Sequence, residues 1–171
     1  SKFKKNETKK ILFNKKILIK DVNFNYPGSN KNVSENITFE IKKGEKIGIV
    51  GTTGSGKTTL IDLILGLLRP TKGKILIDDK VLEDEDFEDW HSIIGYVDQD
   101  GYLSDRTIYK NIAFGIENKK VENLKVIKSA KISQIYDFIK KASNKFETLV
   151  GERGIRLSGG QKQRIRIARA L

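Results

Sequence analysis

The sequence of 171 residues contains no cysteine. Disulfide bonds and thiolate metal sites are therefore excluded, and the composition fits a reducing, cytosolic setting. Long apolar runs are also missing. The longest, "LIDLILGLL" at 60–68, is interrupted by a charge and is far shorter than the ~20 residues of a membrane-spanning helix. No internal repeat is present, and the only compositional bias is a richness in lysine.

The charge balance leaves the class of partner open. The formal net charge is +11 and the sequence pI is about 9.7. This favours an anionic partner such as nucleic acid, an acidic membrane surface or a phosphorylated ligand. Much of the charge is lysine among many Asn and Ile residues, however, and this mixture also fits biased codon usage without a specific partner. The length, with 37% hydrophobic and 32% charged residues, is that of one globular domain.

The first part of the chain predicts a tail followed by two strands. Residues 1–16 are highly charged at their start and have little to bury, which is typical of a solvated basic tail or linker. Apolar and polar residues then alternate in "ILIKDVNFNY" (17–26) and in "NVSENITFEI" (32–41), with Pro-Gly between them. This pattern predicts two antiparallel strands.

The next part alternates predicted strands and helices. "KIGIV" (46–50) is a short apolar run, which is typical of a buried strand, and the glycine-rich loop after it leads into the helical pattern "TTLIDLILGLL" (58–68). Arg-Pro ends this helix. "GKILID" (73–78) and "SIIGYV" (92–97) predict two more strands.

The remainder of the chain has helical spacing. We expect helices in "TIYKNIAFG" (107–115), "VENLKVIKSAKI" (121–132) and "SQIYDFIKKA" (133–142). Together with the helical end of the chain they predict a helical subdomain over about residues 103–168.

A phosphate-binding loop lies between the predicted strand at 46–50 and the helix that follows it. "GTTGSGKT" (51–58) fits the pattern G-x-x-x-x-G-K-[ST], in which glycines turn successive backbone N–H groups inward and the next helix directs its positive end at phosphates. Lys57 would reach the β- and γ-phosphates, and the Thr58 hydroxyl would ligate Mg²⁺. The predicted nucleotide-binding residues here are Gly51, Thr52, Thr53, Gly54, Ser55, Gly56, Lys57, Thr58 and Thr59.

A second segment imitates a metal-binding motif. "KILID" (74–78) resembles the apolar strand ending in Asp that holds Mg²⁺ through water in P-loop ATPases, and Asp79 follows in the position of a base. The segment comes too soon after the first helix. We therefore interpret it as a strand that ends at the surface and leads into the acidic loop "LEDEDFED" (82–89).

At "LSGGQ" (157–161) the sequence resembles the ATP-binding cassette (ABC) family, of which this is the signature motif. The resemblance covers about residues 17–171, predicted to be a partial ABC nucleotide-binding domain. It extends to other family motifs in the same order, namely the A-loop aromatic (Tyr26 in "FNYPGS"), the segment before the Q-loop ("RPTKGKILID"), the Q-loop glutamine (Gln99 in "IGYVDQD") and the exporter-type X-loop ("GERG").

The resemblance implies a fold and a mechanism. The fold is an α/β P-loop NTPase core of the ABC ATPase type, with an N-terminal antiparallel β subdomain and a helical subdomain. Adenine would stack on Tyr26, for about 1–3 kcal/mol by analogy with bases on aromatic rings. Gln99 would face Mg²⁺ and the attacking water, and is assigned a catalytic role together with Lys57. Two cassettes would dimerise head to tail, so that one signature closes over the ATP of the other chain; its residues are Ser158, Gly159, Gly160 and Gln161.

Within the family the motifs most resemble exporters, in particular flippases of lipid-linked oligosaccharides or polysaccharides. Two positions depart from the family pattern. Asp98 stands before Gln99, where exporters commonly have proline, and this puts the stiffness of the Q-loop in doubt. Arg166 takes a position after the signature that is usually small or apolar.

The family elements that follow the signature helix are not found. These are the Walker B Asp, the catalytic Glu, the D-loop and the H-loop histidine, and the core strands that carry them. The only histidine, His91, precedes the Q-loop and is interpreted as a surface or packing residue. We therefore expect a fragment of a longer polypeptide that is poorly active or inactive alone, because loss of a general base typically costs 10²–10⁴-fold in rate.

The leading functional hypothesis is the ATPase engine of an exporter. Its ligands would be ATP and Mg²⁺, and its partners a second nucleotide-binding domain and membrane helices that precede Ser1. It would act at the cytoplasmic face of the inner membrane, where basic residues favour anionic lipids. An ABC-type ATPase of DNA maintenance or repair is the alternative, although no basic stripe with interleaved aromatics is present and no specific nucleic acid is expected. A nucleotide-gated switch without turnover is a third possibility.

Overall fold

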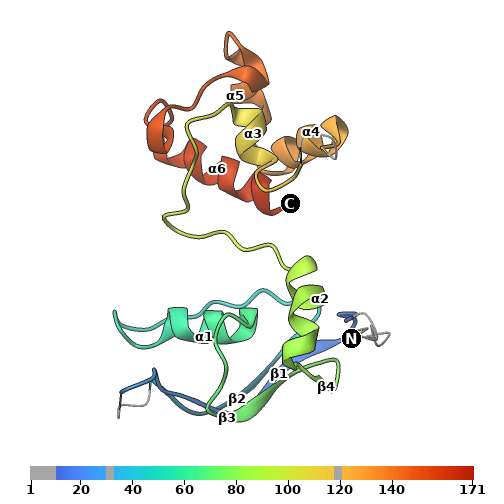
Figure 1. Ribbon diagram of the computed structural model, residues 1–171, viewed down its shortest axis with the longest axis vertical. Helices are drawn as coiled ribbons and strands as arrows, with labels where there is room; N and C mark the ends of the chain where they lie inside the picture. Colours follow the sequence, from blue (N-terminus) through green and yellow to red (C-terminus); the bar gives the residue numbers. More distant parts are fainter. Residues whose placement is uncertain (1–10, 30–32, 118–120) are drawn as a thin grey trace, which may run out of the picture. The chain divides into compact units, whose positions relative to one another are not determined.

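The computed structural model describes residues 11–29, 33–117 and 121–171 (Figure 1). The chain forms two compact units, one up to Ile94 and the other from Gly95 to Leu171. Residues 1–10 of the predicted tail lie outside the described residues. Ile11, by contrast, is only 4% exposed and belongs to the core of the first unit. The packed part of the chain therefore begins earlier than position 17, the boundary that the sequence predicts.

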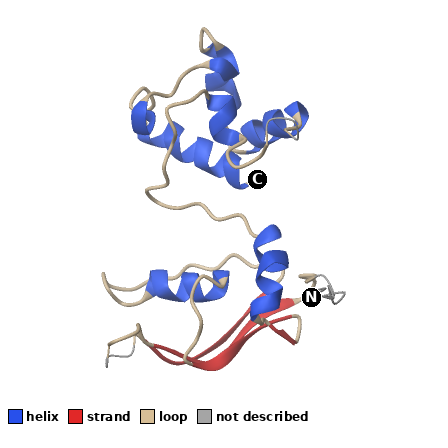
Figure 2. Ribbon diagram, viewed as in Figure 1, coloured by secondary structure: helices blue, strands red, loops and turns tan. Residues whose placement is uncertain are grey.

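The first unit is built on a four-stranded antiparallel sheet (Figure 2). The predicted antiparallel pair and the strand predicted at 73–78 are confirmed. The strand order is β2-β1-β3-β4, with bounds Lys16–Phe24 for β1, Ser34–Lys42 for β2, Lys72–Ile77 for β3 and Lys80–Val81 for β4.

Strand β1 contains a bulge that keeps its apolar side chains on one face. Ile17 and Ile19 are buried, and the buried positions then shift by one residue to Val22 and Phe24. Asp21 has φ 50° at this point, and the pairing of β1 with both neighbours is irregular there. One extra residue in a strand restores the side-chain alternation after an interruption. The bulge therefore lets both halves of β1 contribute to the same core.

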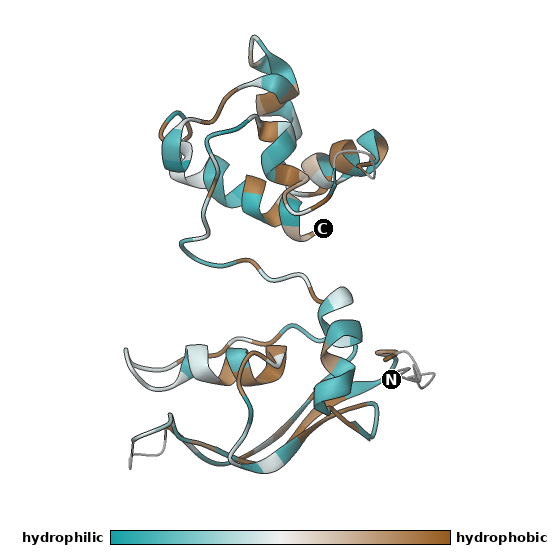
Figure 3. Ribbon diagram, viewed as in Figure 1, coloured by the Kyte–Doolittle hydropathy of each residue, from teal (hydrophilic) through white to brown (hydrophobic). Residues whose placement is uncertain are grey.

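Helices cover one side of this sheet (Figure 2). Helix α1 (Lys57–Leu65) becomes more hydrophobic towards its C-terminal end, where Leu63 is completely buried (Figure 3). A short 3-10 helix, η1 (Asp84–Asp86), leads into α2 (Phe87–Ser92). The Nε1–H of Trp90 donates to the carbonyl of Ile64 at 3.0 Å, so α2 is joined to α1 as well as to the core. The buried residues are Ile11, Ile17, Ile19, Val22, Phe24, Leu63, Ile75, Ile77, Phe87 and Trp90.

Two predicted strands are wrong. Residues 46–50 form no strand, and their side chains are exposed by 46% at Ile47, 37% at Ile49 and 92% at Val50. An apolar strand needs neighbours that satisfy its backbone groups. The strands of the described sheet pair among themselves, and none pairs with this segment. The strand predicted at 92–97 is replaced by the end of α2 and an irregular segment, with which no strand of the described sheet pairs.

The second unit is helical, and the three helices predicted between 107 and 142 are confirmed. They pack with α6 around one apolar core. The bounds are Ile108–Ile112 for α3, Asn123–Ile132 for α4, Tyr136–Lys141 for α5 and Gly159–Ala170 for α6, with short 3-10 turns at Lys145–Glu147 (η3) and Glu152–Gly154 (η4).

A buried amide joins α3 to α6 in this unit. The side chain of Asn111 is completely buried, and its Nδ2 donates to the carbonyl of Ser104 at 3.0 Å. Its Oδ1 accepts from the backbone N–H of Ser104 at 2.9 Å and from Arg169 at 3.2 Å. Burial lowers the pKa of the Arg169 guanidinium, and the nearby charge of Arg166 lowers it further. A buried amide is tolerated only when its donors and acceptors are used, and here both are.

Asp78, just after β3, holds the chain at the start of β1. Its carboxylate accepts hydrogen bonds from the backbone N–H groups of Asn14, Lys15 and Lys16 at 2.5–2.8 Å. Partial desolvation raises the pKa of this carboxyl, but the hydrogen bonds from Lys16, Asn14 and Lys15 and the charge of Lys15 lower it by more, so the pKa lies below its ordinary value. Asp78 therefore has a structural role, in keeping with its exclusion as a metal ligand.

Replacement of Gly73 by Ala is predicted to destabilise the first unit by about 2 kcal/mol or more. Gly73 has φ 81°, and a Cβ there would lie 2.2 Å from the carbonyl oxygen of Asp21 in the bulge. Gly44→Ala is the matched control, since Gly44 has φ 84° and open space around it; we expect about 1 kcal/mol there. Urea unfolding followed by the fluorescence of Trp90, the only tryptophan, measures both. Equal losses in the two variants would contradict the steric explanation.

Replacement of Asp78 by Asn is predicted to destabilise the first unit at neutral pH and to have a smaller effect in acid. A lowered pKa in the folded state means that ionised Asp78 stabilises the fold above the unfolded-state pKa and loses this contribution as the pH falls below about 4. Asn keeps the positive φ of 48° at low cost. Urea unfolding at a series of pH values tests this, with Asp79→Asn in the same turn as the control. A difference from wild type that does not change with pH would contradict it.

Candidate functional site

The phosphate loop has the backbone geometry that an anion requires. Gly54 and Gly56 have φ 78° and 86°, in the left-handed region that side chains disfavour. Gly56 is the N-cap of α1 and provides no side-chain hydrogen bond to the first turn. The first intrahelical bond runs from the N–H of Leu60 to the carbonyl of Gly56 at 2.9 Å. The N–H groups of Lys57, Thr58 and Thr59 therefore have no acceptor within the helix and can donate to phosphate oxygens, whereas that of Ser55 already donates to the carbonyl of Thr52 at 3.2 Å.

Lys57 lies over this loop. Its Nζ donates to the carbonyls of Gly51 at 3.0 Å and Thr52 at 2.7 Å, both at the opposite end of the loop. A Cβ at position 51 would lie 2.6 Å from the Oγ of Ser55, so the loop closes tightly on itself. The ammonium group is thus held across the loop by carbonyls at its start. A phosphate would offer it a stronger, charge-assisted partner than these carbonyls.

A cavity of about 280 Å³ is lined by Tyr26, the aromatic residue predicted to stack on adenine, and by the phosphate loop. Tyr26 and the loop both belong to the first unit. Val33, just before β2, also lines the cavity, and its carbonyl lies 3.1 Å from the Cβ that a side chain at Gly56 would have. Val33 carries no motif in the sequence, because only the folding of the start of β2 against the loop places it there. The lining residues are Tyr26, Val33, Gly54, Ser55, Gly56, Lys57, Thr58 and Thr59.

The ring of Tyr26 is held at the edge of this cavity by contacts on two sides. It packs edge to face on Phe24 with ring centroids 5.0 Å apart. Its hydroxyl lies 3.1 Å from the Oγ1 of Thr59, a buried residue of α1. Tyr26 also begins a turn with Pro27 second and Gly28 third, closed by a 3.0 Å bond from the N–H of Ser29. The ring is 43% exposed, which leaves surface for an aromatic ligand.

Thr58 and Thr59 have different environments, although both were predicted to bind the nucleotide. Thr58 is exposed and lines the cavity, whereas Thr59 is buried and supports Tyr26. Among the described residues no group of three or more His, Cys, Asp and Glu side chains could hold a metal ion. A hydroxyl beside bound phosphates is a typical Mg²⁺ ligand. Thr58 therefore fits a metal that the nucleotide itself helps to bind.

The signature motif starts helix α6 in the second unit. Ser158 and Gln161 form a capping box: Oγ of Ser158 accepts from the N–H of Gln161 at 3.3 Å, and Oε1 of Gln161 accepts from the N–H of Ser158 at 2.9 Å. Both side chains act as acceptors, so the serine O–H and the glutamine amide N–H groups can still donate. Gly159 and Gly160 are exposed, with open space where side chains would be. A ligand can therefore approach the backbone closely.

Gln99 is an exposed residue of the second unit, in the irregular segment before α3. Its backbone carbonyl accepts a hydrogen bond from Nη1 of Arg166 in α6. A cavity of about 410 Å³ lies beside this contact, and its charged lining residues are Arg153, Lys162, Arg166 and Asp100. The structure thus brings Gln99 close to the signature helix. Arg166 was noted in the sequence only as a departure, and no sequence pattern indicated its partner.

The predicted packing role of His91 agrees with its contacts. Its Nε2–H donates to the carbonyl of Leu65 at 2.8 Å, and its ring lies 5.9 Å from that of Phe87. The histidine therefore joins α2 to the end of α1.

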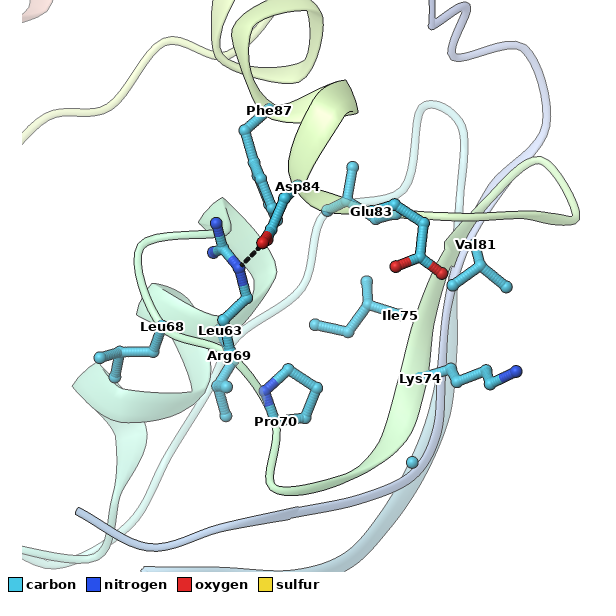
Figure 4. Close-up of a pocket in the computed structure, with 12 residues that line it drawn as sticks. Leu63, Leu68, Arg69, Pro70, Lys74, Ile75, Val81, Glu83, Asp84 and Phe87 are labelled. Carbon is cyan, nitrogen blue, oxygen red and sulfur yellow. Dashed lines mark hydrogen bonds and ion pairs between the residues drawn. The ribbon is translucent and has the colours of Figure 1, made fainter. Parts of the chain in front are cut away.

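A second cavity in the first unit, of about 260 Å³, lies between the end of α1, β3 and the start of α2 (Figure 4). Nε of Arg69 donates to Asp84 at 2.7 Å, and its guanidinium lies 3.5 Å from the centroid of the Phe87 ring. The phosphate loop does not line this cavity. Arg69 and Asp84 pair with each other across the end of α1 and η1, and we assign no nucleotide to this cavity.

Comparison with known proteins agrees with these motifs. The family model described as "ABC transporter" matches residues 34–171. The chain is 44% identical over 156 residues to the uncharacterized ABC transporter ATP-binding protein YfiB of Bacillus subtilis, covering 91% of this chain and 27% of that protein. It is 43% identical to the leukotoxin translocation ATP-binding protein LktB of Mannheimia glucosida (91% and 22%). It is 39% identical to the mitochondrial iron-sulfur clusters transporter ABCB7 of Danio rerio (91% and 20%).

A solved structure supports the same assignment. The fold is similar to that of a bacterial Atm1-family ABC exporter with ATP bound, with a TM-score of 0.83 and 34% identity over 94% of this chain and 28% of that one. The chain thus spans about a quarter of the length of the proteins that it matches. No helix in the described part of the chain is long and apolar enough to cross a membrane. With the phosphate loop, the signature and the fold all in agreement, the chain belongs to the ABC transporter family.

Proposed function

We propose that the first unit binds ATP in the cavity between Tyr26 and the phosphate loop. The observation that carries this proposal is the cavity itself, in which an aromatic ring and the glycine-rich loop at the start of α1 line one space. Adenine stacks on Tyr26, and the phosphates lie against the N–H groups of residues 54–58, among which that of Ser55 exchanges its bond to the carbonyl of Thr52. Lys57 exchanges its carbonyl partners for the β- and γ-phosphates. Thr58 supplies a hydroxyl to Mg²⁺.

The signature is proposed to act on ATP held by another chain. Ser158 and Gln161 keep free donors beside two exposed glycines, and this set suits the γ-phosphate of a nucleotide bound elsewhere. A head-to-tail dimer of two such domains would use one phosphate loop and one signature at each site. Gln99 then contributes an uncharged oxygen near Mg²⁺ and the attacking water.

In the complete protein, this ATPase is proposed to power export at the cytoplasmic face of a membrane. The relatives named for leukotoxin translocation and iron-sulfur cluster transport support an exporter, as does the Atm1-family structure. Another relative, from Bartonella henselae, is named for β-(1→2)glucan export. Since the cargoes differ, they do not select one for this protein, and the resemblance to flippases remains a prediction. The transmembrane part is proposed to lie in the same polypeptide.

The 171-residue chain by itself is proposed to bind ATP better than it cleaves it. Residues 158–171, from the signature to the last residue, contain no Asp or Glu. We assign no carboxylate general base within the chain, and a missing base typically lowers a rate by 10²–10⁴-fold. The alternative function in DNA maintenance finds no support in the names of these relatives, which are those of transporters.

Replacement of Lys57 by Ala is predicted to weaken ATP binding by about tenfold or more, because a charge-assisted hydrogen bond contributes about 1.5–3 kcal/mol. Isothermal titration calorimetry with Mg-ATP measures this. Lys46→Ala, an exposed lysine outside the cavity, is the control for net charge and should bind like wild type. Unchanged affinity in Lys57→Ala would count against the proposed site.

Replacement of Tyr26 by Ala is predicted to weaken ATP binding by about 5–100-fold, from the loss of base stacking. Tyr26→Phe keeps the ring and loses only the bond to Thr59, so most of the affinity should remain. Inorganic tripolyphosphate has no base, and its affinity should be the same for wild type and Tyr26→Ala. Equal losses for ATP and tripolyphosphate would mean that Tyr26 shapes the loop rather than stacking on adenine.

A further inference from the structure

The two positions that depart from the family pattern contact each other in the second unit. Nη1 of Arg166 donates to the carbonyl of Asp98 at 3.4 Å and to that of Gln99 at 2.5 Å. One guanidinium nitrogen thus holds two successive carbonyls of the Q-loop. The partners are backbone atoms, so the bonds fix the path of the chain at Gln99 and leave its side chain free to meet a ligand.

The loop and the arginine are packed closely. A Cβ at Gly101 would lie 2.9 Å from the Cδ of Arg166, so the stem of the side chain runs against the backbone after Gln99. The Nε of Arg166 is buried and has no hydrogen-bond partner among the described residues. Burial of an unpaired donor costs free energy. The contact therefore stabilises the fold less than its two hydrogen bonds alone would suggest. This favours a role for Arg166 in positioning the backbone at Asp98 and Gln99.

Helix α6 provides a rigid support for the contact. Ile165 and Ala168 are buried on either side of Arg166 in the sequence, and the capping box closes the start of the helix. Three residues later, Arg169 donates to the carbonyl of Tyr102 at 2.9 Å. Arg169, on the same helix, thus holds the backbone a few residues after Gln99, at Tyr102. Among the described residues, only Arg166 provides such a side-chain bond at Asp98 and Gln99 themselves.

We propose that Arg166 is a positioning residue for Gln99, which it joins to the signature helix. This inference rests on the proposed ATPase function. An aspartate at position 98 leaves the backbone before Gln99 freer than a proline would. Arg166, which lies outside the loop, supplies by hydrogen bonds the backbone restraint that a proline would have given. The bonds from the signature helix thus fix the backbone of Gln99 relative to α6 while its side chain acts on the attacking water, where a displacement of about 1 Å can cost 10²-fold in rate.

The contact is tested first in the 171-residue chain by NMR. Carbonyl ¹³C resonances respond to hydrogen bonding, so those of Asp98 and Gln99 should shift in Arg166→Ala. Arg164→Ala is the matched control, because Arg164 lies on the same helix and donates to the carbonyl of Gln134 at 3.1 Å instead. It should leave both resonances in place. Equal helical circular dichroism in the two variants checks that α6 is intact, and unshifted resonances in Arg166→Ala would overturn the proposal.

The consequence is tested by ATP hydrolysis in the full-length transporter polypeptide. Arg166→Ala should lower kcat by about tenfold or more and leave KM for ATP within about twofold, because Gln99 acts on the attacking water rather than on ground-state binding. Arg166→Lys should restore part of kcat, as a lysine donates to one carbonyl without the fixed fork. Recovery of kcat by Asp98→Pro in the Arg166→Ala protein would support the restraint directly. Wild-type kcat in Arg166→Ala, or a loss confined to KM, would overturn the proposal.

These outcomes are separable from those for the nucleotide site. If Lys57→Ala binds ATP like wild type, the proposed function fails, whatever Arg166 does. If Lys57→Ala loses ATP while Arg166→Ala keeps both its carbonyl resonances and its kcat, the nucleotide site stands and only the role of Arg166 is wrong.

Discussion

The backbone N–H groups at the start of a helix need acceptors that the helix cannot supply, and both the phosphate loop and the signature motif depend on this constraint. Helix α1 follows a left-handed glycine that offers its first turn no side-chain cap, so those donors are left to the solvent or to an anion. Helix α6 meets the same need with Ser158 and Gln161, which satisfy each other's backbone. The first arrangement suits a nucleotide that is held firmly. The second suits one that is met and released, because the cap already supplies an acceptor to Gln161 while Gly159 and Gly160 keep their N–H groups for a ligand.

Local patterns in the sequence were sufficient for most of the fold and for the position of the glycine-rich loop at the start of α1. The alternation in β1 and β2 follows from one face of a sheet being buried, and the glycines of the phosphate loop follow from the positive φ values at Gly54 and Gly56. The signature resembles its family because a short run of small and polar residues can both cap a helix and expose its donors. In each case the physical requirement lies within about ten residues of sequence.

What the sequence could not predict depends on partners far along the chain. The apolar run at 46–50 has the composition of a buried strand, yet burial requires neighbouring strands, and composition does not report whether they are present. The bulge at Asp21 is visible only as a slip in the alternation, and its dependence on Gly73 only in three dimensions. Arg166 lies 67 residues from Gln99 in the sequence. A single sequence could mark it as unusual but could not name the carbonyl to which it donates.

The exposed segment at 46–50 has a practical consequence for the isolated chain. Ile47, Ile49 and Val50 present β-branched side chains to water on a backbone that no described strand pairs with. Such a segment is a template for intermolecular β-pairing, the process by which otherwise folded chains form aggregates. Its flanks carry lysines, whose mutual repulsion weakens as salt is added. Aggregation of this polypeptide during storage therefore depends on ionic strength and concentration as much as on temperature.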